Sequence, residues 1–128
     1  MGKAADKLYN IYIPNSNLDW MNYRIDRKED LTFHHIVKRE HGGKAEVSNG
    51  ALLLKKSHNY LHVIEYKDLS IYIAINKIFK IINSQLEEPN LEQRLIIESL
   101  LKDFEDQHIE DTNKKGSYLI RRKWLDRW

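Results

Sequence analysis

The chain has 128 residues, a formal net charge of +2 and no cysteine. With 41% hydrophobic and 31% charged residues, it has the composition of an ordinary globular protein with one core. Disulfides and cysteine-ligated metal centres are excluded, and no segment has the uninterrupted apolar length of a membrane span. The first residues lack the apolar core of a signal peptide. We therefore expect a single domain over residues 1–128, located in the cytoplasm and not in a membrane.

Residues 1–30 are expected to form an N-terminal arm. Apolar residues alternate over 8–13, which predicts a short strand that Pro14 ends. Residues 18–23 are expected to form one or two helical turns. The arm carries four large aromatic residues, Tyr9, Tyr12, Trp20 and Tyr23. These side chains would either stack on nucleic-acid bases or pack on the core, and we expect packing.

Two strands and a helix are predicted next. Residues 31–37 are rich in β-forming side chains and bounded by polar clusters, and residues 51–54 form a second short apolar run. From Ser57 onward, apolar residues recur at helical spacing. His58 and His62 lie four residues apart, so they share one face of this helix.

Two longer helices are predicted in the C-terminal half, forming a helical hairpin over residues 67–111. Asp68 is the expected N-cap of the first helix, which covers residues 69–86. Pro89 interrupts the pattern. The second helix covers residues 91–108, with an apolar stripe of Leu91, Leu95, Ile97, Leu101 and Phe104. A basic aromatic tail follows over residues 112–128, and its last residues are expected to form a short helix.

The strand–strand–helix segment contains four histidines and one asparagine at characteristic distances along the sequence. His34 and His35 are adjacent in the first predicted strand. Asn49 follows His35 by 14 residues, and His58 follows Asn49 by nine. His62 is four residues further on. Over about 36 residues, this spacing resembles that of the HNH nuclease superfamily, whose active site is a ββα-metal fold.

The resemblance implies a role for each of these five residues. His34 would be a metal ligand, and His35 would be the general base that takes a proton from the attacking water. Asn49 would hydrogen-bond to His35 and orient its ring. His58 would be a second ligand, and His62 a third ligand or a phosphate contact. The expected cofactor is one divalent ion (Mg, Mn, Zn or Ni), and imidazole ligands favour the transition metals over Mg²⁺.

Each of these residues also has an ordinary structural interpretation. The His34–His35 pair alone is more often a surface or half-buried pair than a site. Asn49 followed by glycine is most often a turn signal. His58 and His62 alone would be a helix pair, and only the joint spacing favours a site. Many members of the superfamily add a zinc knuckle of two Cys-x-x-Cys pairs, so in this chain other elements must stabilise the motif.

Charge is unevenly distributed along the chain. Residues 21–56 carry eight basic and five acidic side chains, residues 87–111 carry two and nine, and residues 112–128 carry six and one. Basic regions suit phosphate binding, although the acidic segment and the basic tail would also attract each other. The expected phosphate contacts are Lys38, Arg39, Lys44, Lys55 and Lys56.

Together these patterns predict an α+β fold with added C-terminal helices, and the resemblance implies a ββα-metal motif at residues 31–66. The expected function is that of a metal-dependent endonuclease that hydrolyses DNA phosphodiester bonds with a histidine general base and one divalent ion. Two alternatives remain open: a nucleic-acid-binding or phage assembly factor without turnover, and a ribonuclease that uses the same site.

Overall fold

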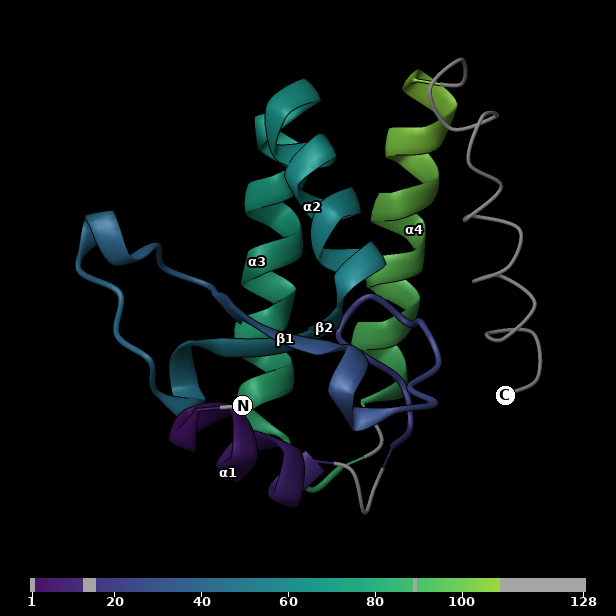
Figure 1. Cartoon of the computed structure of the whole chain (residues 1–128). Helices are drawn as coiled ribbons and strands as arrows, with labels where there is room; N and C mark the ends of the chain where they lie inside the picture. The colour runs from purple at the N-terminus through teal and green to yellow at the C-terminus, as the bar shows by residue number, and fades with distance from the viewer. Residues whose placement is uncertain (1, 13–15, 89, 109–128) are drawn as a thin grey trace.

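The computed structural model describes residues 2–12, 16–88 and 90–108, so the predicted tail at residues 112–128 lies outside it. The predicted α+β class is confirmed. The described residues form a two-stranded antiparallel sheet and four α-helices (Figure 1). Their bounds are α1 Lys3–Tyr12, β1 Leu31–His35, β2 Gly50–Leu54, α2 Lys55–Lys67, α3 Leu69–Ser84 and α4 Leu91–Gln107. Short 3-10 turns precede β1 (Lys28–Asp30) and interrupt the β1–β2 connection (Arg39–His41 and Val47–Asn49).

The sheet is covered on both faces. On one face, Gly50 of β2 lies against Phe33 of β1 and Leu8 of α1. On the other face, the ring of His34 packs against those of His58 from α2 and Phe79 from α3. Every residue of β2 is buried, which is why its sequence is a continuous apolar run and does not alternate. The strand predicted over residues 31–37 ends two residues early, at His35.

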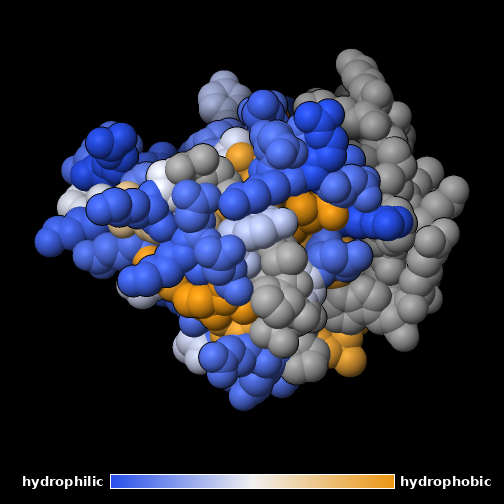
Figure 2. All heavy atoms as spheres, turned by 60° about the horizontal axis from the view of Figure 1, so that its bottom comes forward, coloured by the Kyte–Doolittle hydropathy of each residue, from blue (hydrophilic) through white to orange (hydrophobic). Residues whose placement is uncertain are grey.

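The strand predicted at residues 8–13 is wrong, because Lys3–Tyr12 is a helix. The two-residue alternation is coincidental: the buried residues are Ala5, Leu8 and Tyr12, whose spacing of three and four places them on one helical face. That face packs on β2 and leaves polar side chains outside. Accordingly, the underside of the molecule, where α1 lies, is mainly hydrophilic with small separate hydrophobic areas (Figure 2).

The segment after α1, residues 16–25, covers the free edge of β2. The helical turns predicted at residues 18–23 are absent, so that prediction was wrong. The backbone amide of Trp20 donates to the carbonyl of Leu52 at 3.1 Å, and the amide of Leu54 donates to the Asp19 carboxylate at 3.0 Å. The Trp20 indole donates to Asn83 of α3 at 3.0 Å. Trp20 and Tyr23 are fully buried, so the packing role expected for them is confirmed.

The two helices predicted in the C-terminal half are present as α3 and α4, which pack against each other. Asp68 caps α3, accepting a hydrogen bond from the Ile71 amide at 3.2 Å, as expected. The expected stripe of α4 is only partly right, because Leu91 and Leu95 are about half exposed. The buried face passes through Arg94, Ile97, Leu101 and Phe104. No helix among the described residues combines the length and hydropathy needed to cross a membrane.

Candidate active site

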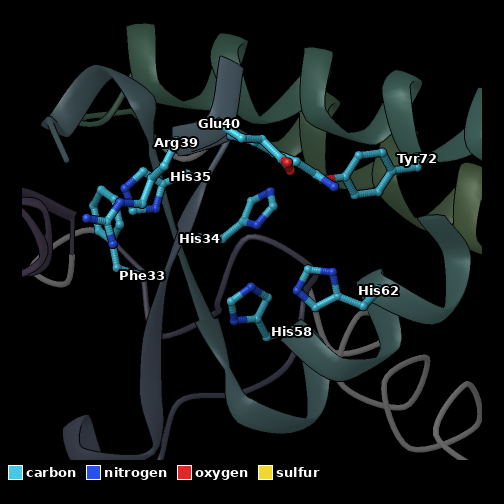
Figure 3. A pocket seen from close by; sticks show the side chains of 9 residues that line it. Phe33, His34, His35, Arg39, Glu40, His58, His62 and Tyr72 are labelled. Carbon is cyan, nitrogen blue, oxygen red and sulfur yellow. The ribbon is translucent and has the colours of Figure 1, made fainter. Parts of the chain in front are cut away.

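A pocket of about 430 Å³ opens where β1, α2 and α3 meet. It is lined by Phe33, His34, His35, Lys38, Arg39, Glu40, His58, His62 and Tyr72. All four histidines named from the sequence pattern therefore reach one hollow. Figure 3 shows His34, His58 and His62 gathered on one side of the strands, with His35 and Phe33 on the other. This division follows from the alternation of side chains along a strand.

His34 is the most deeply buried of the four, at 3% exposure. Its Nε2 lies 2.8 Å from Oδ1 of Asn76 on α3. The pKa of His34 is lowered to about 4, mainly by burial. The hydrogen bond to Asn76 opposes this shift, and the positive charges that His58 and His62 would carry add to it. The ring is therefore neutral at neutral pH and has one nitrogen lone pair available.

His58 is half-buried, lies nearer the pocket mouth than His34, and is hydrogen-bonded to β1. Its Nδ1 lies 2.9 Å from the hydroxyl of Thr32, and that hydroxyl donates to the carbonyl of Leu53 at 2.8 Å. Because the single hydroxyl proton of Thr32 is used on Leu53, its oxygen accepts from His58, so Nδ1 of His58 carries the proton. Burial, followed by the charge of His62, lowers the pKa of His58.

His62 is the outermost of the three and is oriented by an acidic residue one turn along α2. Its Nδ1 lies 3.3 Å from Oε1 of Glu65. Glu65 also forms an ion pair with Lys38. Burial alone would raise the pKa of Glu65, but the hydrogen bonds from Lys38 and His62 bring it below its usual range. Lys38, expected to be a phosphate contact, is therefore already engaged by a carboxylate.

The three rings share one arrangement of partners. The ring centroids of His34 and His58 are 5.3 Å apart, and those of His58 and His62 are 4.8 Å apart and nearly parallel. In each ring one nitrogen is bonded to a side-chain oxygen, and the other makes no hydrogen bond to any described residue. The described part of the chain contains no set of three or more His, Asp or Glu side chains already spaced to hold a metal ion.

His35 has different surroundings from its neighbour. Its ring lies edge-on to Phe33 at 5.1 Å, on the face of β1 that His34 does not share. Partial burial, followed by the nearby charge of Arg39, lowers the pKa of His35. The ring is therefore mostly unprotonated at neutral pH, which is the form that can accept a proton.

Asn49 does not make the expected hydrogen bond to His35. Its side chain bonds to backbone instead, accepting from the amide of Val37 at 2.8 Å and donating to the carbonyls of Val37 and Lys44 at 3.1 and 3.0 Å. Its own carbonyl accepts from the amide of Ile36 at 2.8 Å. Asn49 thus fixes the chain immediately after His35 and acts on that histidine only through the backbone.

Comparison with known proteins does not identify this pocket. Models of protein families, curated proteins and solved structures were all searched, and none matches. The chemistry of the site is therefore inferred from its own side chains.

The basic residues expected to contact phosphate lie in different parts of the structure. Arg39 lines the histidine pocket. Lys55 and Lys56, at the start of α2, line a separate hollow of about 300 Å³, and the Lys56 amine also lies 4.8 Å from the centre of the Tyr23 ring. Lys44 is exposed in the β1–β2 connection, where its carbonyl accepts from Asn49.

Three residues that orient the histidines were not identified from the sequence. They are Thr32, Glu65 and Asn76. One of them had a recognisable signal: Asn76 is a polar residue on the apolar face of the α3 pattern, between Tyr72 and Phe79. Thr32 and Glu65 have no such signal, because a threonine in a strand and a glutamate on a helix surface are both ordinary.

Proposed function

We propose that this chain is a metal-dependent nuclease of the HNH type, which hydrolyses phosphodiester bonds in DNA with one divalent ion. One observation carries the proposal: three imidazoles enter one pocket, each oriented by a hydrogen bond through one nitrogen, while the other nitrogen makes no hydrogen bond to any described residue. Histidine ligands of metal ions are commonly held in this way, with the second ring nitrogen on a carboxylate or carbonyl. The order of elements, strand, loop, strand and helix, also fits the ββα-metal motif.

The donor set is chemically suited to a transition metal. Ligating histidines must be unprotonated, and burial keeps the pKa of His34 low enough for this at neutral pH. His34 would supply one donor from the interior, half-buried His58 a second, and His62 a third from the exposed side of α2. Imidazole nitrogens suit Zn²⁺, Ni²⁺ or Mn²⁺ better than Mg²⁺. A divalent ion bound here would offset negative charge on the phosphate and on the leaving oxygen.

His35 is the general base in this proposal. Its lowered pKa leaves it neutral near pH 7, and it lines the same pocket as the three ligands while lying on the other face of β1. It accepts a proton from the water that attacks phosphorus, as the bond to the leaving oxygen breaks. Asn49 fixes the backbone that follows His35, and Arg39, at the pocket wall, contacts the phosphate.

The test is a nicking assay on supercoiled plasmid with the full chain, run with Mn²⁺, Zn²⁺, Ni²⁺ or Mg²⁺ and with EDTA. We expect conversion to open circles that depends on the metal and stops with EDTA. A parallel reaction with labelled RNA separates the ribonuclease alternative. Binding of plasmid without cleavage under every metal would contradict nuclease activity and favour a binding or assembly factor.

A further inference from the structure

Asn76 is a buried polar side chain on the apolar face of α3, a helix outside the strand–strand–helix unit. It is 7% exposed. Its Nδ2 lies 3.0 Å from the carbonyl oxygen of Tyr72, and its Oδ1 lies 2.8 Å from Nε2 of His34. The helix does not need this side-chain hydrogen bond, because the carbonyl of Tyr72 already accepts the ordinary helical bond from the backbone amide of Asn76. The polar side chain in the core therefore calls for another explanation.

The hydrogen-bond partners settle which atoms carry protons. A backbone carbonyl only accepts, so the atom of Asn76 that faces Tyr72 must be its NH₂ group. The atom that faces His34 is consequently the amide oxygen, which also only accepts. Nε2 of His34 must then carry a proton. A neutral imidazole has a single N–H, so Nδ1 of His34 is left as the lone-pair atom.

From this geometry we infer that Asn76 is a positioning residue, which holds His34 in its Nε2–H tautomer and leaves Nδ1 as the nitrogen able to bind a metal. The inference rests on the proposed function only for the use made of Nδ1. The ligand rings then differ: His34 offers Nδ1, while His58 and His62, bonded through Nδ1 to Thr32 and Glu65, offer Nε2. α3 thereby takes part in the site without supplying a ligand.

The direct readout is ¹⁵N NMR of the histidine rings in the metal-free full chain, which distinguishes Nδ1–H from Nε2–H tautomers. We expect His34 to show the Nε2–H form. Asn76→Leu keeps the volume but removes the acceptor, so the tautomer preference should be lost. Asn76→Asp keeps an acceptor at the same place and should restore the Nε2–H form. Ile75→Val, which trims a buried neighbour on α3, controls for general loosening and should leave the tautomer unchanged.

The second readout is Zn²⁺ affinity, measured by competition with a chromophoric chelator. We expect Asn76→Leu to weaken binding about 10- to 100-fold, the usual effect of losing a partner of a ligating histidine. Asn76→Asp should bind as tightly as the wild type or more so, and Ile75→Val should be unchanged.

The inference and the proposed function fail in different ways. A Nδ1–H tautomer of His34 in the wild type, or a Nε2–H tautomer that persists in Asn76→Leu, would overturn the inference whether or not metal binds. Unchanged Zn²⁺ affinity in Asn76→Leu would also overturn it. Absence of Zn²⁺ binding and of nicking in the wild type would overturn the proposed function, while the tautomer measurement would still decide the role of Asn76.

Discussion

His34 and His35 are neighbours in the chain but have opposite surroundings. His34 is buried among aromatic rings and bonded to Asn76, whereas His35 lies on the other face of β1 beside Phe33. Two adjacent residues of a strand cannot both point to one ion without a distorted backbone. The alternation therefore favours one ligand and one base, and the two roles are separable by mutation.

Replacing the base should abolish turnover and spare the metal. In His35→Ala we expect single-turnover nicking to fall by about 10²- to 10⁴-fold, the contribution of a positioned general base. Zn²⁺ affinity should stay near the wild-type value, because His35 is on the opposite face from the ligands. His41→Ala, which removes an exposed histidine of the same connection, is the matched control and should cleave normally. Lost Zn²⁺ binding in His35→Ala would show that it is a ligand.

Asn49 acts through the backbone, so its loss should affect rate before metal binding. Asn49→Ala removes the bonds to Val37 and Lys44 that fix the chain after His35. We expect nicking at saturating metal to fall about 10- to 100-fold, comparable with the loss of other orienting groups. Asn49→Asp can still accept from Val37 but cannot donate, so it should recover only part of the rate. A wild-type rate in Asn49→Ala would reduce this residue to an ordinary turn former.

Among the elements, the 16–25 segment joins the site-bearing unit to the rest of the fold. The Asp19 carboxylate is fully buried and accepts four hydrogen bonds, from the amides of Met21, Tyr23 and Leu54 and from the hydroxyl of Ser57 at 2.6 Å. The last two donors lie at the junction of β2 and α2, where Leu54 ends β2 and Ser57 directly precedes His58. Asp19 therefore helps to hold the start of the helix that carries two of the proposed ligands.

Burial makes Asp19 a source of pH-dependent stability. Burial raises its pKa from 3.8 to about 6, although its four hydrogen bonds oppose the rise. The unfolded chain loses this proton near pH 4 and the folded chain near pH 6, so the free energy of unfolding should decrease as pH rises between these values. A difference of this size amounts to about 3 kcal/mol.

The check is urea unfolding at pH 4 to 7 of the wild type and of Asp19→Asn, which cannot ionise. Other groups titrate equally in both proteins, so the difference between the two curves isolates Asp19. We expect the free energy of unfolding of the wild type to fall relative to that of Asp19→Asn as pH rises. A gap that is constant with pH would mean that Asp19 has the same pKa in the folded and unfolded chain.

The accuracy of the sequence predictions also varies by element. The helix at residues 69–86 and the two strands were predictable, because their patterns are long or are bounded by turn residues. The helix Lys3–Tyr12 was mistaken for a strand, since Tyr9 and Ile11 add apolar residues outside the buried face formed by Ala5, Leu8 and Tyr12. The exposure of Leu91 and Leu95 was unpredictable because it depends on how α4 is rotated against α3.

At the scale of the whole molecule, the histidine spacing predicted the pocket better than it predicted the contacts within it. His34, His35, His58 and His62 do line one hollow. The predicted hydrogen bond from Asn49 to His35 was wrong, because sequence spacing can bring residues close together without determining which hydrogen bonds they form. The pairing of Lys38 with Glu65 joins two elements 27 positions apart, which no local pattern reveals.

The rest of the fold surrounds the strand–strand–helix unit that carries the histidines. The sheet has α1 on one face, α2 and α3 on the other, and the 16–25 segment along the edge of β2. A two-stranded sheet with one helix is too small to bury a stable core alone. The added helices therefore both stabilise the unit and, through Asn76, orient one of its histidines.

The central claim is that His34, His58 and His62 bind one divalent ion. The most direct measurement is calorimetric titration of Zn²⁺ into the wild type, His34→Ala, His58→Ala and His62→Ala, with His41→Ala as the control. We predict one ion per chain in the wild type and the control. Affinity should fall by roughly 100-fold or more in His34→Ala and His58→Ala, since two donors hold an ion poorly, and less in His62→Ala, where water replaces the exposed ligand. Absence of binding in the wild type, or unchanged affinity in His34→Ala and His58→Ala, would contradict the claim.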